Sequence, residues 1–134
     1  MPADTRQLEV RRKFRDYLIW LFRKIDGFPK KQKYLLGERI GNAALDVSES
    51  LIRIQYAPAS ERKAIIPELN LRLEILRETM RVAWELKFLS DKSFLWQEAN
   101  VDEVGRMAWR LAHPASTPAA VPKASSQGPT LGVS

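Results

Sequence analysis

The sequence predicts an all-α protein, an antiparallel up-down four-helix bundle. Apolar residues recur every three or four positions in four long segments, Gly and Pro number only 6 and 8, and the connections between segments are short. Helical spacing puts the apolar side chains on one face of each segment, and short connections make successive helices antiparallel. We therefore expect a bundle over residues 1–112 and a disordered tail, rich in Pro, Ala and Ser, over residues 113–134.

The first two helices are predicted over residues 5–26 and 31–57. The apolar face of the first consists of Phe14, Leu18, Leu21 and Ile25, and that of the second of Leu36, Ile40, Ala44, Val47, Leu51 and Ile54. Gly37 and Gly41 interrupt the second helix, where each costs roughly 1 kcal/mol relative to Ala. A close helix crossing would offset this cost, because glycine lets two backbones approach.

The third helix is predicted to begin at Ser60, a suitable N-cap, or at Pro67, which suits a first helical turn, and to run to Leu89. It carries two apolar stripes, which are Leu69, Leu73, Leu76, Met80, Trp84 and Phe88, and Leu71, Ile75, Val82, Leu86 and Leu89. A helix that is apolar on two sides must be covered on both. We predict that a second subunit covers the second stripe, with a central place in the monomer as the alternative. The fourth helix is predicted from Ser93 to Ala112.

Few residues of this chain are suited to chemistry. It has no Cys and a single His, His113, so thiolate sites and Ser–His or Cys–His catalysis are not expected. The Glu-x-x-His pairs of a di-iron bundle are absent. Glu98, Asp102 and Glu103 lie close together on the last helix, but surface carboxylates are far commoner than paired catalytic ones. We expect no enzyme, no cofactor, no metal and no small-molecule substrate.

No apolar stretch approaches the length of about 20 residues that a membrane span requires. The first residues lead into a charged segment rather than an apolar one, which argues against a signal peptide. We therefore expect a soluble, cytoplasmic protein.

Positive charge is concentrated at the start of the chain. The net charge is +6, residues 1–33 hold ten Lys or Arg against four Asp or Glu, and the remainder is balanced. Such asymmetry favours an anionic partner, with a solubilising face as the alternative. The predicted nucleic-acid-binding residues are Arg11, Arg12, Lys13, Arg15, Arg23, Lys24, Lys30, Lys31, Lys33, Arg39, Arg77 and Arg81.

Two of these groups have a structural alternative. Arg77 and Arg81 can instead pair with Glu74, Glu78 or Glu85 along their own helix, and the lysines of residues 30–33 can be a solvated turn. No base-reading motif is present, so binding to RNA or DNA should be salt-dependent and show little sequence preference. Aromatic side chains can stack on bases, but helical spacing favours packing for Trp20, Tyr34, Trp84, Trp96 and Trp109.

Three fragments, spread over roughly residues 12–112, carry a family resemblance. They are Phe28-Pro29-Lys30-x-x-Lys33-Tyr34-Leu35-Leu36-Gly37-Glu38-Arg39-Ile40, then Leu76-Arg77-x-x-Met80-Arg81 with Leu86-x-x-Leu89-Ser90, and last Asp102-Glu103-Val104-Gly105-Arg106-Met107. In these fragments the chain resembles Avd, the four-helix-bundle accessory protein of diversity-generating retroelements. It is more distantly similar to the bundle proteins encoded by intervening sequences in ribosomal RNA genes.

The resemblance implies a homopentameric barrel with a positive surface. Such a protein binds the reverse transcriptase and its template RNA or cDNA, and supports mutagenic reverse transcription without being the polymerase. Carried onto this chain, the implied contact residues are Lys30, Lys33, Arg39, Arg77 and Arg81, and the basic first helix is added from its charge alone. One alternative is a structural oligomeric bundle of the intervening-sequence type without a retroelement role. Another is a peripheral membrane protein that uses its basic amphipathic first helix.

Overall fold

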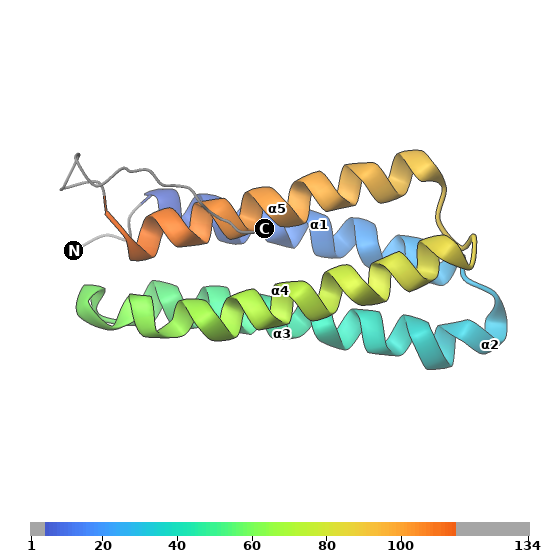
Figure 1. Cartoon of the computed structure of the whole chain (residues 1–134), viewed down its shortest axis with the longest axis horizontal. Coiled ribbons are helices and arrows are strands. Elements are labelled where there is room, and N and C mark those ends of the chain that lie inside the picture. Colours follow the sequence, from blue (N-terminus) through green and yellow to red (C-terminus); the bar gives the residue numbers. More distant parts are fainter. Residues whose placement is uncertain (1–4, 115–134) are drawn as a thin grey trace.

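The computed structural model describes residues 5–114, and the regular secondary structure within them is all helical. The four long helices are α1 (Thr5–Asp26), α3 (Glu38–Tyr56), α4 (Arg62–Glu85) and α5 (Asp91–Ala112). A short helix α2 (Lys30–Gln32) and a π-helical turn η1 (Lys33–Gly37) precede α3, and a 3₁₀ turn η2 (Ala59–Glu61) precedes α4. Figure 1 shows the long helices lying side by side along one axis. The predicted all-helical four-helix bundle is confirmed. Residues 115–134 of the expected tail lie outside the described residues.

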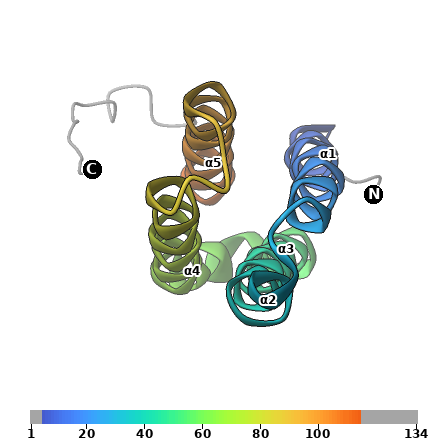
Figure 2. The same cartoon turned by 90° about the vertical axis from the view of Figure 1, so that its right-hand side faces the viewer.

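The helices form a ring in chain order. α1 packs against α3, α3 against α4, α4 against α5, and α5 against α1 (Figure 2). α1 and α4 run in one direction, and α3 and α5 run in the other (Figure 1). The α1–α2 and α4–α5 connections therefore meet at the same end of the bundle, on the right in Figure 1.

The predicted apolar faces line the interior of the ring. Fully buried positions come from every long helix and include Leu21, Ile40, Leu76 and Val104. Burying one such side chain stabilises the fold by roughly 1.5–3 kcal/mol. A polar contact crosses this core, where the Tyr17 hydroxyl donates to Gln97 Oε1 at 3.0 Å. Burial raises the pKa of Tyr17, so the hydroxyl remains protonated and keeps donating this bond between α1 and α5.

The two glycines predicted at a close helix crossing lie where α3 meets α1. A Cβ atom at Gly37 would lie 2.8 Å from Ile25 Cγ2, and one at Gly41 would lie 2.9 Å from Phe22 Cε1. Both distances are shorter than van der Waals contact between carbon atoms allows. The absence of side chains at these positions therefore permits the observed approach of α1 and α3.

The helix predicted over residues 31–57 is confirmed to within one residue at each end, but it is not α-helical throughout. The wider π turn at Lys33–Gly37 interrupts it, and the α-helix resumes at Glu38 and ends at Tyr56. Periodicity did not reveal the interruption because Leu36 and Ile40 keep their helical spacing across it. The π turn exposes two large side chains, with Tyr34 71% and Leu35 64% accessible to solvent.

The third helix begins and ends at positions that differ from the prediction. It starts at Arg62, between the two predicted starts, because Ser60 belongs to the 3₁₀ turn and Pro67 lies inside the helix. It ends at Glu85 rather than Leu89. The last helix begins at Asp91, earlier than predicted, and the Ser90 hydroxyl caps it by accepting from the backbone N–H of Ser93 at 3.1 Å.

Backbone geometry after Glu85 explains the early end of α4. Lys87 adopts the left-handed conformation with φ 68°. The N–H of Phe88 then donates to the carbonyl of Ala83 at 2.9 Å, and the N–H of Lys87 donates to the carbonyl of Trp84 at 2.8 Å. This pair of bonds is a Schellman motif, which usually has Gly where this chain has Lys87.

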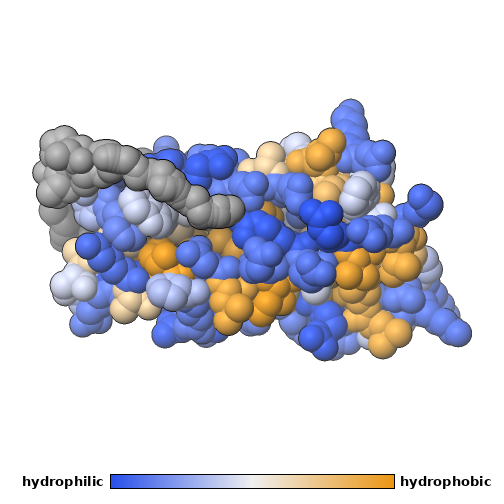
Figure 3. Space-filling view, in the orientation of Figure 1, coloured by the Kyte–Doolittle hydropathy of each residue, from blue (hydrophilic) through white to orange (hydrophobic). Residues whose placement is uncertain are grey.

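The second apolar stripe of α4 is exposed over most of its length. Leu71, Ile75, Val82 and Leu86 are 61%, 45%, 39% and 51% accessible. Leu89 does not belong to this stripe, contrary to the prediction, because it lies beyond the helix and is buried in the connection. Figure 3 shows apolar side chains gathered over the lower half of the molecule, where α4 lies.

Candidate nucleic-acid interface

Basic residues from two distant segments meet at one end of the bundle. Phe28, in the α1–α2 connection, packs against Phe88, in the α4–α5 connection, with 5.4 Å between ring centroids. Phe28 is almost fully buried, so the two connections are held together by a core contact. We call the cations around them the turn-end cluster, and its members are Arg23, Lys24, Lys30, Lys31, Lys33, Lys87 and Lys92.

No carboxylate within residues 5–114 lies within 4.0 Å of a cationic nitrogen of the turn-end cluster. The Lys24 ammonium lies 5.8 Å from the ring centre of Trp20, a distance suited to a cation–π contact. The acidic residues nearest in sequence to these cations are fewer, namely Asp26, Glu38, Glu85 and Asp91. The turn end thus offers positive charge that can meet phosphate without first breaking an ion pair with a described residue.

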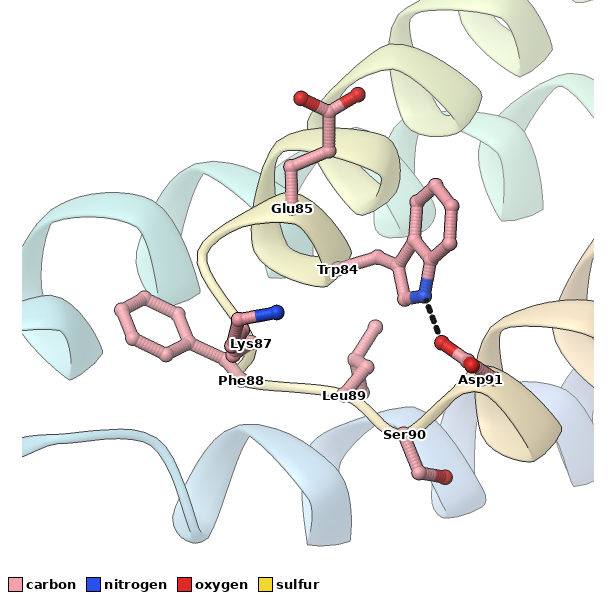
Figure 4. Close-up of a pocket in the computed structure, with 7 residues that line it drawn as sticks. All are labelled: Trp84, Glu85, Lys87, Phe88, Leu89, Ser90 and Asp91. Carbon is pink, nitrogen blue, oxygen red and sulfur yellow. Dashed lines mark hydrogen bonds between the residues drawn. The ribbon is translucent and has the colours of Figure 1, made fainter.

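Figure 4 shows the part of the turn end that belongs to the α4–α5 connection. A hollow of about 510 Å³ is lined by Trp84, Glu85, Lys87, Phe88, Leu89, Ser90 and Asp91. The Trp84 indole N–H donates to Asp91 Oδ1 at 2.8 Å, and its ring stacks on Phe94 with centroids 4.5 Å apart. Trp84 is therefore engaged in holding α4 to α5. The other charged groups that line the hollow are Lys87 and Glu85.

Sequence reasoning missed Lys87 and Lys92 as candidate binding residues. They lie far along the chain from the basic first segment, and the Phe28–Phe88 contact holds their connection to the one that precedes Lys30. A non-glycine residue in the left-handed region destabilises the backbone by roughly 1–2 kcal/mol, so Lys87 occupies a position where Gly would be more stable. Strain of this kind is often found at functional positions.

The cations in the first half of α1 lie away from the turn end. The spacing of a helix puts Arg11, Arg12, Lys13 and Arg15 roughly 20 Å from the end of α1 that joins α2. Arg11 donates a hydrogen bond to Gln55 Oε1 of α3. Arg12 and Arg15 are exposed and form no ion pair with a residue in the described range. The structure therefore divides the predicted basic segment into two separate groups.

Arg77 and Arg81 link α4 to α5 through carboxylates. Arg77 lies 2.9 Å from Asp102 of α5 and 3.3 Å from Glu74 of its own helix, and Arg81 lies 3.6 Å from Glu98 of α5. Arg77 thus pairs with Glu74 along α4, as the alternative interpretation predicted, whereas Arg81 pairs with Glu98 across the contact between α4 and α5, which we call the seam. Exposed ion pairs of this kind contribute roughly 0–1 kcal/mol each.

Glu103, also on α5, pairs with two arginines of its own helix. It lies 2.9 Å from Arg106 and 3.4 Å from Arg110. Burial alone would raise the pKa of Glu103, but the hydrogen bond from Arg106 and the charges of both arginines outweigh it and lower that pKa. The carboxylates considered for acid–base work are therefore engaged in ion pairs.

The aromatic residues divide between packing and exposure. Trp20 and Trp84 pack against the core, which confirms the packing prediction for these two. Trp96 rests on Trp20, with centroids 4.7 Å apart, and Trp109 stacks on His113. Tyr34 is exposed beside Lys33, so it is the aromatic side chain at the turn end that can stack on an unpaired base.

Arg39 is exposed at the start of α3, within two helical turns of Lys33, and has no carboxylate partner among residues 5–114.

Across the same residues, no three His, Asp or Glu side chains are grouped so that they could hold a metal ion. None of the described helices has both the length and the apolar character needed to cross a bilayer.

The family comparison agrees with the resemblance found in the sequence. No curated protein and no solved structure matches the chain. A family model described as bAvd-like matches residues 8–112, which cover all four long helices except the first turn of α1. The family supports an accessory role in retroelements, and its accessory proteins are generally non-catalytic. The chain belongs to the bAvd-like family.

Proposed function

We propose that this protein is a non-catalytic accessory subunit of a diversity-generating retroelement, and that its turn end binds the template RNA or cDNA. Family membership supports the accessory role and suggests reverse transcriptase as the protein partner. The observation that carries the nucleic-acid part is the turn-end cluster, seven cations without a carboxylate within ion-pair distance in the described part of the chain. The protein acts as a scaffold that holds RNA near the polymerase.

Phosphate binding by these cations should be strongly salt-dependent. Each phosphate that a Lys or Arg neutralises releases condensed counterions, so affinity falls as salt rises. With four phosphate contacts to a single strand, affinity falls about 50-fold when the salt concentration rises about fourfold. No element of the described structure is arranged to read base edges, so we expect little sequence preference, with Tyr34 adding a base-stacking contact.

The other predicted cations differ in how readily they could bind phosphate. Arg39 is exposed and unpaired within the described residues, so we propose it as an additional contact. Arg77 and Arg81 would have to leave Asp102 and Glu98 first, which makes them weaker candidates. We place the main contact surface on the turn-end cluster for this reason.

Assembly into a homo-oligomer is the second part of the proposal. The family resemblance implies a homopentamer, and the exposed apolar stripe of α4 supports burial against another copy. We propose a cytoplasmic location from the composition of the chain. An assembly that presents several turn ends to one RNA would gain affinity through multivalency, without any new kind of contact.

Filter binding with structured RNA tests the nucleic-acid part directly. The full-length variant Lys30→Gln, Lys31→Gln, Lys33→Gln should bind at least about tenfold more weakly at low salt, with a shallower salt dependence and an unchanged melting temperature. A matched control, Arg53→Gln, Arg106→Gln, Arg110→Gln, removes the same charge from exposed positions outside the turn end and should stay within about threefold of wild type.

Two results would count against the turn end as the binding surface. One is binding that does not change with salt, and the other is an equal loss in both triple variants. No RNA binding at all at low salt would favour the alternative of a structural bundle without a retroelement role.

A further inference from the structure

We propose that an unpaired base of the bound RNA or cDNA stacks on Trp96 while the neighbouring phosphates meet Lys24 and Lys92, which gives single strands a contact that a duplex cannot make. The inference deepens the proposed function: it rests on nucleic-acid binding at the turn end and names the form of nucleic acid that is bound. It is carried by an exposed tryptophan that lies beside two cations of the turn-end cluster.

Trp96 is a large aromatic side chain that the bundle leaves exposed. It lies in the second turn of α5 and is 44% accessible. Its ring contacts that of Trp20 on α1, with 4.7 Å between centroids and 50° between the ring planes. Trp20 in turn packs against the core, so Trp96 rests on a fixed support. The tilted contact leaves nearly half of the Trp96 surface open to a ligand.

Two lysines lie next to the tryptophans, on the side that faces the turn end. Lys24 follows Trp20 by four residues, and Lys92 precedes Trp96 by four residues. Because α1 and α5 run in opposite directions, both steps lead toward the turn end, by about 6 Å along each helix (Figure 1). Residues four apart lie on the same side of a helix, so each lysine shares a face with the tryptophan of its helix. A phosphate beside a base on Trp96 would therefore meet two cations.

The charges around Trp96 determine on which side of it phosphate can lie. Lys24 and Lys92 are exposed and have no carboxylate within ion-pair distance among residues 5–114. Asp16 lies on the same face of α1, eight residues before Lys24 and away from the turn end. Asp91 is next to Lys92 in the chain, but its carboxylate accepts the indole hydrogen bond shown in Figure 4. Phosphate is therefore favoured on the turn-end side of Trp96.

Stacking of this kind distinguishes single strands from duplexes. In a duplex both faces of each base are covered by its neighbours, whereas an unpaired base has a face to offer to an aromatic ring. Every base has such a face, so stacking tolerates any sequence, in agreement with the absence of a base-reading element among the described residues. Tyr34 offers one stacking contact at the turn end, and Trp96 adds another on α5.

Filter binding with three probes at low salt tests the proposal on the full-length protein. The probes are an unstructured oligouridine, an abasic oligonucleotide of the same length, and an RNA duplex. Trp96→Leu should bind oligouridine at least about fivefold more weakly than wild type, and should bind the abasic probe and the duplex within about twofold of wild type. Because this change removes stacking and no charge, the salt dependence of oligouridine binding should stay the same.

Trp109→Leu is the matched control. Trp109 is also on α5 and is 51% accessible, but it lies near the end of the helix that is remote from the turn end. Its replacement should leave the affinity for all three probes at the wild-type value. Trp96→Phe keeps an aromatic ring and should retain most of the oligouridine affinity.

The two lysines should have the complementary effect. Lys24→Gln, Lys92→Gln keeps the stacking surface and removes two phosphate contacts. Oligouridine binding should weaken, and the slope of the logarithm of affinity against the logarithm of salt concentration should become shallower by about 1.4, which is about 0.7 for each contact. The abasic probe should lose affinity to the same extent, because it carries the same phosphates.

Tryptophan fluorescence of the wild type gives a measurement that needs no folded variant of Trp96. Oligouridine should quench the fluorescence, because a base stacks on an indole, whereas the abasic probe should bind without quenching it. The variant Trp109→Leu should keep the quenching. Binding of oligouridine without any quenching would contradict the proposal.

Three further outcomes would overturn this inference and leave the turn end as the binding surface, provided that the triple lysine variant still loses affinity. They are an unchanged oligouridine affinity in Trp96→Leu, an equal loss with all three probes, and an equal loss in Trp109→Leu. A change in particle size by light scattering with unaltered oligouridine affinity would show that a protein, and not nucleic acid, covers Trp96. If the wild type binds none of the probes, the proposed nucleic-acid binding fails, and this inference fails with it.

Discussion

The turn end and the seam between α4 and α5 are both rich in cations, but they use them differently. At the seam, Arg77 lies 2.9 Å from Asp102 and Arg81 lies 3.6 Å from Glu98, so these charges hold two helices together. At the turn end, none of the seven cations has a carboxylate within ion-pair distance among residues 5–114. The number of basic residues therefore does not locate an anion site, whereas cations without a carboxylate within ion-pair distance help to do so.

Removal of the Phe28–Phe88 contact, which joins the α1–α2 and α4–α5 connections, should have the largest effect on the free energy of unfolding. Phe28→Ala leaves a cavity beside Phe88 and should cost about 3 kcal/mol in free energy of unfolding. It should also weaken RNA binding, because the two halves of the turn-end cluster are then no longer held together. Chemical denaturation and filter binding measure the two effects.

The matched control for this change is Phe28→Leu, which keeps most of the volume and should cost less than about 1.5 kcal/mol. If Phe28→Ala destabilises the fold and leaves RNA affinity at the wild-type value, the two connections do not act as one surface.

A seam substitution should separate stability from binding. Arg77→Met keeps the apolar stem but loses the ion pairs to Asp102 and Glu74, and should lower the free energy of unfolding by about 1 kcal/mol or less. Water can solvate the exposed carboxylates that remain. RNA affinity should stay within about twofold of wild type. A loss of RNA affinity as large as that of the turn-end lysine variant would refute the distinction between the two regions.

Replacement of Lys87 by Gly should change stability and RNA binding in opposite directions, and both changes should be small. Lys87→Gly relieves the left-handed backbone at φ 68° and should stabilise the fold by about 1 kcal/mol. The same change removes one cation from the turn-end cluster, so RNA binding should weaken severalfold. Lys92→Gln removes a charge without a change in backbone, and should weaken RNA binding with no gain in melting temperature. A gain in stability with unaltered RNA affinity would exclude Lys87 from the surface.

Periodicity predicted the long helices well and their interruptions poorly. The bounds of α1 were predicted correctly because Gly27 and Pro29 end the apolar pattern sharply. The π turn at Lys33–Gly37 escaped prediction because its flanking apolar residues keep helical spacing. The end of α4 escaped because a lysine occupies the left-handed position, where Gly would have marked the end of the helix.

By itself the sequence determined the helical class, the apolar stripes, the excess of positive charge near the start of the chain and the family resemblance, because each is a local pattern of residue types. Only the tertiary structure decided which cations are paired and which are free. Packing brought Asp102 to Arg77, and it brought the connection that carries Lys87 against the connection that carries Phe28. Contacts between residues so far apart in the chain depend on how the helices pack, and helical periodicity describes only one helix at a time.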